Sequence, residues 1–379
     1  NRYARDARPE SNYHYPGINL SGPVHFPCTA FNTERDRHYF FHGFELQRQT
    51  IYQGTTLGVV PTLAQRQGDF SELLTGGGQN LAQPRIVTIP CCGPGTGRPA
   101  PNNDLSPYID PTGQALLGLY PQPSYEDPEN RYNYALTELM PLNRWQLTSR
   151  VDWNVTESTH AYVRLALERE DQRWARGLWI SYSAFELPSR VRSDNSAWSL
   201  AANVTSVLSP SLTNEIVVSA SRLEMDHDWE DPSKVSVESL GLEGFQGVFG
   251  YERRDAPIGI VPSGQNLGEL FAVGGFPLYA HSDSLSISDT LTKVTGAHTV
   301  KLGIFVERGR KQQNTYSDLG RFILASPWLP GTGNDYGDLL VGRLGRYRES
   351  TVSPHGEFRF WNLEGFIQDS WKVRRNLTL

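Results

Sequence analysis

The feature that most constrains this chain is a period-two alternation of apolar and polar residues. From Trp145 to Val155, every odd position except Ser149 is apolar and every even position is polar. After a short polar turn at 156–158, the alternation resumes and continues to Glu170. Because successive side chains of a β-strand point to opposite faces, this pattern predicts a hairpin with one apolar face.

The same design recurs along the chain, with short turns and long loops in alternation. Further short turns lie at 209–212, 295–298 and 374–376. The long connections are rich in Gly, Pro, Asn and Asp and span 51–143, 172–193, 229–280 and 313–356. Short turns on one side and long loops on the other are typical of bacterial outer-membrane barrels, where the short turns are periplasmic. Placing one short turn in the periplasm puts all the others there too, together with the connection at 25–37.

Segment length supports a membrane-spanning sheet. The alternating segments run for about 11–16 residues, which is longer than a usual soluble strand and fits a tilted membrane crossing. No run approaches the roughly 18 apolar residues that a transmembrane helix needs. We therefore predict an all-β fold, a partial transmembrane antiparallel β-barrel of about ten strands with long extracellular loops. Asn1 follows no signal peptide and Asn376–Leu379 resembles the start of another strand, so we expect both ends to be cut from a longer protein.

The composition excludes one class of partner and leaves the cysteines open. The net charge of −6 gives no basic excess, so nothing favours nucleic acid as a partner. Cys28, Cys91 and Cys92 lack the spacing of a metal site. They are either incidental thiols or staples of a loop in an oxidising compartment. A bridge from Cys28 to one of the adjacent pair would leave one thiol over.

Several segments, spread over most of the chain, share the pattern of one family. The most specific is Val60-Pro61-Thr62 followed by Arg66-Gln67-Gly68-Asp69-Phe70-Ser71. The others, in chain order, are 19–24, 37–45, 109–111, 119–123, 296–303, 335–342 and 366–379. Together they resemble the Oar-like branch of the TonB-dependent outer-membrane receptors, which is common in Acidobacteria and related bacteria. The loop at 86–103, with its two adjacent cysteines, departs from that pattern.

The resemblance implies a place in a larger architecture. Residues 1–379 would be the N-terminal part of the receptor barrel, with the plug, the TonB box and the C-terminal strands outside this sequence. The implied partners are outer-membrane lipid and lipopolysaccharide, TonB through the missing N-terminal part, and an unidentified transported ligand. No cofactor is implied. The implied location is the bacterial outer membrane.

Candidate functional residues are few. No arrangement of nucleophile, base or paired carboxylates stands out, so we predict that the chain is not an enzyme. Ligand contacts are expected in the loops 51–143, 229–280 and 313–356, because recognition concentrates in loops on a rigid scaffold. Within the first loop, the candidate ligand-binding residues are Arg66, Asp69 and Phe70. The competing interpretation is that Asp69 pins a compact loop and that Phe70 packs inside it.

Two groups of residues raise the question of a metal, and we predict no metal site. His38 and His42 would share one face of a strand about 13 Å apart, too far to hold one ion. The acidic run from Glu224 to Asp231 lies where a strand leaves the membrane. We interpret it as a solvated loop edge, and the alternative is a divalent ion associated with lipopolysaccharide.

The function that fits best is uptake of a large or scarce ligand through a gated outer-membrane barrel. A second hypothesis is a surface structural or adhesion role without transport. A third is a secreted, soluble carbohydrate-binding or carbohydrate-cleaving β-protein, which would need paired carboxylates in an aromatic cleft. An upstream plug would favour the first over the second.

Overall fold

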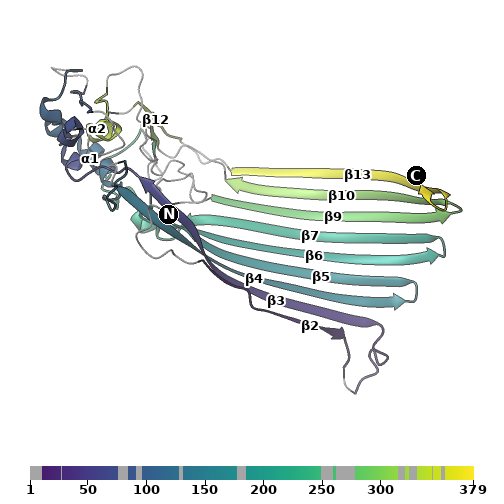
Figure 1. Cartoon of the computed structure of the whole chain (residues 1–379). Helices are drawn as coiled ribbons and strands as arrows, with labels where there is room; N and C mark the ends of the chain where they lie inside the picture. The colour runs from purple at the N-terminus through teal and green to yellow at the C-terminus, as the bar shows by residue number, and fades with distance from the viewer. Residues whose placement is uncertain are drawn as a thin grey trace.

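A computed structural model shows one long, curved antiparallel sheet with a smaller body at one end (Figure 1). The structure describes residues 11–26, 28–75, 84–90, 96–127, 131–176, 185–248, 259–261, 278–314, 321–323, 331–343, 345–350 and 355–379. Within this part of the chain, no helix is long and apolar enough to cross a membrane. The described strands pair only with their neighbours along the sheet, and the two outer strands do not meet, so the sheet is not closed.

The sheet has eleven strands, most of them joined in chain order. At one edge, β1 (Asn12–His14) and β2 (Gly17–Pro23) both pair with β3 (His38–Gly58). The strands that follow across the sheet are β4 (Tyr134–Thr156), β5 (Thr159–Trp174), β6 (Val191–Ser209), β7 (Leu212–Trp229), β9 (Leu278–Thr295), β10 (His298–Asn314), β13 (His355–Arg374) and β14 (Leu377–Thr378). The prediction of an all-β antiparallel sheet is confirmed.

The predicted alternation of short turns and long loops is also confirmed, but the strands are longer than expected. All the short turns lie at the end of the sheet that carries the C-terminus, and the long connections lie at the other end (Figure 1). Strand β3 continues to Gly58 and β4 begins at Tyr134, so the first long loop is narrower than the predicted 51–143. The pairing of β3 with β4 continues through an irregularity between Tyr52 and Thr55, and this stretch shows no clean alternation from which to predict it.

The two faces of the sheet differ in chemistry as the alternation predicts. On one face, here called the apolar face, large side chains are exposed on neighbouring strands: Val151, Trp153, Val163, Trp198, Leu200, Val204, Val218, Leu285, Ile287, Leu302, Ile304, Trp361, Leu363 and Ile367. The opposite face, here called the polar face, carries mainly Ser, Thr, Asn and charged residues, of which Ser282, Ser284, Ser286 and Ser288 on β9 are an example. A soluble sheet would cover such an apolar face with a second layer.

The buried core lies at the long-loop end, outside the sheet proper. Segments 59–75, 84–127, 185–190, 230–248, 259–261, 321–323 and 331–350, in their described parts, form a body that we call the loop cap. It contains the helices α1 (Pro111–Gly118) and α2 (Asp335–Leu340) and a small sheet of β8 (Gly259–Val261), β11 (Arg321–Ile323) and β12 (Arg346–Arg348). Short 3-10 helices span Gln65–Gln67, Ser71–Thr75, Pro101–Asn103, Ser106–Tyr108 and Pro232–Lys234. The cap therefore joins loops that leave the sheet at distant strands.

The contact between α1 and α2 depends on a glycine. A Cβ added at Gly113 would lie 2.2 Å from the carbonyl oxygen of Leu339. We expect Gly113→Ala to destabilise the cap by about 1–3 kcal/mol, because the backbone of α2 must move. Gly118→Ala is the matched control, since no atom lies within 4 Å of a Cβ there. The readout is protease resistance of the cap in the full-length protein, and equal resistance of the two variants would contradict the packing.

Candidate functional site

The apolar face ends at a charged belt that crosses the sheet obliquely. One row of cross-strand neighbours runs through Leu147, Leu167 and Trp198 and continues through Arg222 and Asp283. The same row is thus apolar on β4 to β6 and charged on β7 and β9. A plane that cuts tilted strands produces this slant, and barrel strands tilt by about 35–45° in a membrane. The belt therefore marks where an apolar surrounding layer, in contact with the apolar face, ends on the long-loop side.

Ion pairs connect neighbouring side chains of the belt at the long-loop end of the apolar face. Arg169 binds Asp194 at 2.9 Å on the neighbouring strand, and Arg222 binds Glu224 at 2.7 Å. Arg310 binds Glu357 at 3.1 Å, across from β10 to β13. These side chains are partly solvent-exposed, so each pair contributes little stability by itself. Their position matters more than their strength, because they lie just beyond the apolar residues at the long-loop end.

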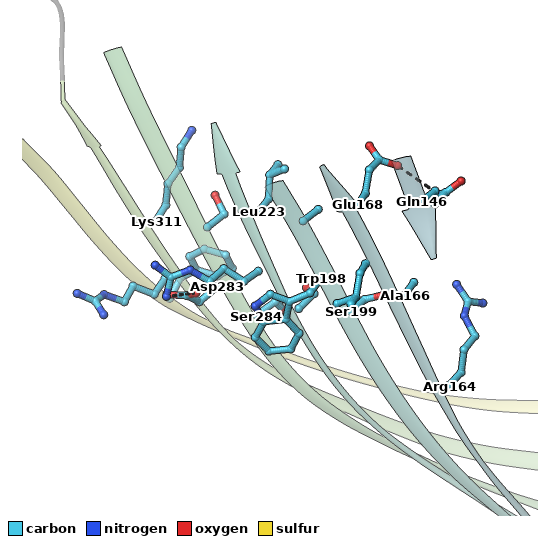
Figure 2. A pocket seen from close by; sticks show the side chains of 17 residues that line it. Gln146, Arg164, Ala166, Glu168, Trp198, Ser199, Leu223, Asp283, Ser284 and Lys311 are labelled. Atoms are coloured by element: carbon cyan, nitrogen blue, oxygen red, sulfur yellow. Dashed lines mark hydrogen bonds and ion pairs between the residues drawn. The ribbon is translucent and has the colours of Figure 1, made fainter. Parts of the chain in front are cut away.

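The polar face carries a hollow of about 610 Å³. Small residues line much of it, including Ala166, Ser199 and Ser284, and charged groups such as Glu168 and Lys311 stand beside them (Figure 2). Gln146 donates a hydrogen bond to Glu168 at 3.2 Å. The sequence motifs did not predict this hollow. The signal that could have indicated it is the polar half of the strand alternation, rich in Ser and Ala on four adjacent strands.

The three loop residues predicted to bind ligand, Arg66, Asp69 and Phe70, all make contacts inside the loop cap. Phe70 is fully buried in the shared core. The side chain of Asp69 accepts a hydrogen bond from the backbone N–H of Ser71, and hydrogen bonding by Ser71 lowers the pKa of this carboxyl. Arg66 donates to the carbonyl oxygens of four residues, Pro61, Leu117, Tyr120 and Pro121. These contacts agree with the interpretation that Asp69 pins the loop and Phe70 packs inside it.

A partly buried carboxyl in the same loop is expected to make the stability of the cap depend on pH. Burial raises the pKa of Glu72 above its ordinary value of 4.5, although Thr62 and Gln65 donate hydrogen bonds to it. The unfolded cap therefore loses this proton first as the pH rises. The stability that Glu72 contributes is therefore fully present below its ordinary pKa. It is lost as the pH rises through the raised pKa that Glu72 has in the folded cap.

We expect Glu72→Gln to flatten the pH dependence of cap stability. In the wild type, protease resistance should fall as the pH rises above 4.5, and the variant should lose part of that fall. The measurement is the rate of proteolysis of the full-length protein between about pH 4 and 7, with a protease active over that range. A wild-type cap that gains resistance relative to the variant as the pH rises would reverse the sign and refute the assignment.

The residues considered for metal binding have other partners. His42 hydrogen-bonds Ser149, and His38 stacks on the ring of Trp153 at 5.7 Å. Within the predicted acidic run, Asp226 pairs with His281, Glu224 with Arg222, and Glu230 with Arg173. In the described ranges, no group of three or more His, Cys, Asp or Glu side chains is arranged to hold an ion.

Of the three cysteines, the structure describes Cys28, which is exposed in the connection between β2 and β3, at the short-turn end. Cys91 and Cys92 lie outside the described residues, so a bridge from Cys28 to one of them stays an untested prediction.

Comparison with known proteins gives the family. The sequence model described as "Outer membrane beta barrel domain" matches residues 1–379, and the chain belongs to this family. The apolar face is therefore the lipid-facing wall in the bacterial outer membrane, and the polar face lines the interior. No curated protein sequence matches the chain.

Solved outer-membrane proteins share the arrangement only loosely. The outer membrane transporter YddB from Escherichia coli has a TM-score of 0.42 and 7% identity, and covers 96% of this chain. The ferric yersiniabactin uptake receptor FyuA from Yersinia pestis has a TM-score of 0.43, 7% identity and 96% coverage. The closed form of the ferric-catecholate import receptor Fiu from E. coli K12 has a TM-score of 0.40 and 12% identity, and covers 97% of this chain. The chain spans 32%, 36% and 42% of these proteins, and scores this low define neither fold nor function by themselves.

Proposed function

We propose that this chain forms part of the wall and outer mouth of a TonB-dependent receptor that takes up a large or scarce ligand. The observation that carries the proposal is the polar face with its hollow, lined by Arg164, Glu168 and Lys311 among small residues. A polar interior with charged side chains gives a large polar ligand a hydrated path along this wall. The motifs quoted from the sequence, Val60–Thr62 and Arg66–Ser71 above all, support the Oar-like branch of these receptors.

The proposed partners follow from the two ends of the barrel. Lipid and lipopolysaccharide surround the apolar face and its charged belt, and the ligand enters past the loop cap. TonB acts on the periplasmic side, through a part of the receptor that precedes this barrel segment. No bond chemistry is assigned to the chain. Residues 1–379 are the N-terminal part of the barrel in this proposal, with a plug and further strands elsewhere in the protein.

Formaldehyde crosslinking in intact cells tests the proposal. The full-length protein, tagged at its C-terminus, is purified from crosslinked cells and probed for TonB. We expect a TonB adduct with this protein and none with an unrelated, plug-free porin as the control. If the protein is correctly assembled in the outer membrane and still yields no TonB adduct, the proposed transport function is overturned.

The loop cap favours one other function, a structural or adhesive role at the cell surface. Its core is drawn from four separate loops, so the described parts of these loops form one packed body. Tyr336, on the last of these loops, donates a hydrogen bond to the carbonyl oxygen of Val59 on the first at 2.7 Å. Cell–surface binding that persists in a strain lacking TonB would support this role.

A further inference from the structure

The charged belt continues onto β10 with an arginine that has no carboxylate partner. Arg308 lies on the lipid-facing side of β10, directly across from Leu285 on β9 and from Trp361 on β13. Its exposed guanidinium lies over the ring of Trp361, 5.7 Å from the centroid, and makes no ion pair within the described ranges. A cation at the edge of an apolar layer is costly to place there, and ionisable residues within a membrane usually have a function.

Two further arginines lie beside Arg308 and form a patch with it. Arg310 follows on the same face of β10, and it is directly across from Arg359 on β13. Like charges that face each other on adjacent strands are unfavourable. Glu357 offsets part of this repulsion, because it pairs with Arg310 at 3.1 Å and with Arg359 at 2.6 Å. One carboxylate thus serves two of the three arginines, and the guanidinium of Arg308 keeps its donors.

The nearest other carboxylate does not neutralise this arginine patch. Asp283 on β9 lies directly across from Arg310, but its ion pair, at 3.6 Å, is with Arg222. Arg222 also pairs with Glu224 at 2.7 Å. In this region of the described chain, four arginines therefore meet three carboxylates: Arg222, Arg308, Arg310 and Arg359 against Glu224, Asp283 and Glu357.

The wall on the membrane side of the arginine patch is apolar. Val306 and Leu363 face each other on β10 and β13, one position deeper than Arg308 and Trp361. Leu363 is 73% exposed, so an acyl chain can pack against it. Guanidinium groups bind phosphate by paired, charge-assisted hydrogen bonds. The surface thus combines an excess cation at the boundary with an apolar wall below it, which suits an amphiphilic anion.

We propose that Arg308, Arg310 and Arg359 bind a phosphate group of lipid A, the membrane anchor of lipopolysaccharide. The patch lies toward the long-loop end, which faces the outside of the cell, and lipopolysaccharide forms the outer leaflet on that side. The phosphate monoesters of lipid A carry more negative charge than the diester of a phospholipid, so they match a site with several guanidinium groups. The inference rests on the proposed contact between the belt and lipopolysaccharide, and it does not require transport.

Native mass spectrometry of the full-length protein tests this site. The protein is purified from outer membranes in detergent, stripped of bound lipid and titrated separately with four probes. The probes are lipid A, lipid A freed of its phosphates, phosphatidylglycerol and inorganic phosphate. We expect lipid A to bind about tenfold more tightly than each of the others, because it alone joins acyl chains to phosphate monoesters.

Substitutions of Arg308 tie the binding to the patch. Arg308→Gln should lower the affinity for lipid A about tenfold, because the excess cation is lost. Arg308→Lys keeps the charge without the planar fork and should lose less. Arg169→Gln is the matched control, since this arginine of the belt already pairs with Asp194 at 2.9 Å. We expect the control to change the affinity by less than about twofold.

The heat-modifiable band of the folded barrel verifies that each variant has assembled. The proposal is overturned if Arg308→Gln binds lipid A as tightly as the wild type, or if Arg169→Gln loses as much affinity. It is also overturned if phosphate-free lipid A, phosphatidylglycerol or inorganic phosphate binds as tightly as lipid A. The TonB crosslinking experiment is unaffected by these outcomes, so the lipid site and the transport function can fail separately.

Discussion

Arginine on the lipid-facing side of β9 should destabilise the barrel strongly, whereas arginine one residue away should be tolerated. Ile287→Arg places a cation between Val218 and Val306, its cross-strand neighbours on the apolar face. We expect a loss of about 2–4 kcal/mol in the free energy of folding into lipid, the cost of a cation near the bilayer midplane. The measurement is refolding of the full-length protein into lipid vesicles under a denaturant titration.

Ser286→Arg is the matched control for this prediction. Ser286 lies on the polar face, where its hydroxyl is 2.7 Å from that of Ser219, and an arginine there can reach the water of the interior. We expect its cost to stay below about 1 kcal/mol. If the two arginines destabilise equally, the faces are wrongly assigned. If Ser286→Arg is the more damaging, the barrel is inside out relative to this description.

The faces could be predicted from sequence because strand geometry is nearly invariant. Side chains alternate with a period of two whatever the surroundings, so the odd residues from Trp145 to Val155 had to share one side. The short turns are local features as well, and each was found within a residue or two of its place. Those turns alone also predict that their end of the sheet faces the periplasm.

The cap could not be predicted, because its contacts join segments far apart in the chain. Tyr120 packs edge-on against both Phe185 and Tyr336, with ring centroids 5.5 and 5.1 Å away. Each ring belongs to a different loop, and no periodicity relates them. Strand ends beyond the membrane were underestimated for a related reason. There the strands continue into the cap, and neither face is required to be apolar.

The alternation on β9 has one exception. Asp289 stands on the same face as Leu285, Ile287 and Leu291 and interrupts the apolar residues once. This exception can be read from the sequence, whereas its cross-strand neighbours, Ile216 and Ile304, follow only from the register of β7, β9 and β10.

Arg66→Ala is expected to have the largest effect on the loop cap. The Arg66 side chain donates to Leu117, Tyr120 and Pro121 at 3.2, 3.0 and 2.7 Å, across the end of α1. Alanine leaves the carbonyl groups of Tyr120 and Pro121 without this donor in a partly buried site, whereas the Leu117 carbonyl still accepts from the backbone N–H of Tyr120. With a cost of about 1–3 kcal/mol for each of the two unsatisfied groups, we expect about 2–5 kcal/mol in total. Protease cleavage within residues 59–127 of the full-length protein should accelerate accordingly.

Comparison of Arg66→Ala with Arg66→Lys tests whether Arg66 supports the loop cap or binds the ligand. Arg66→Lys keeps the charge but presents a compact ammonium group, which cannot reach several carbonyls with the geometry of a planar guanidinium. If Arg66 supports the cap, both variants should open it, lysine less than alanine, while Leu63→Ala, a change at an exposed neighbour, leaves it closed. If Arg66 instead binds the ligand, alanine should leave protease resistance unchanged and lysine should retain ligand-dependent growth. Unchanged resistance in Arg66→Ala would therefore refute the structural role and return Arg66 to the ligand-binding residues.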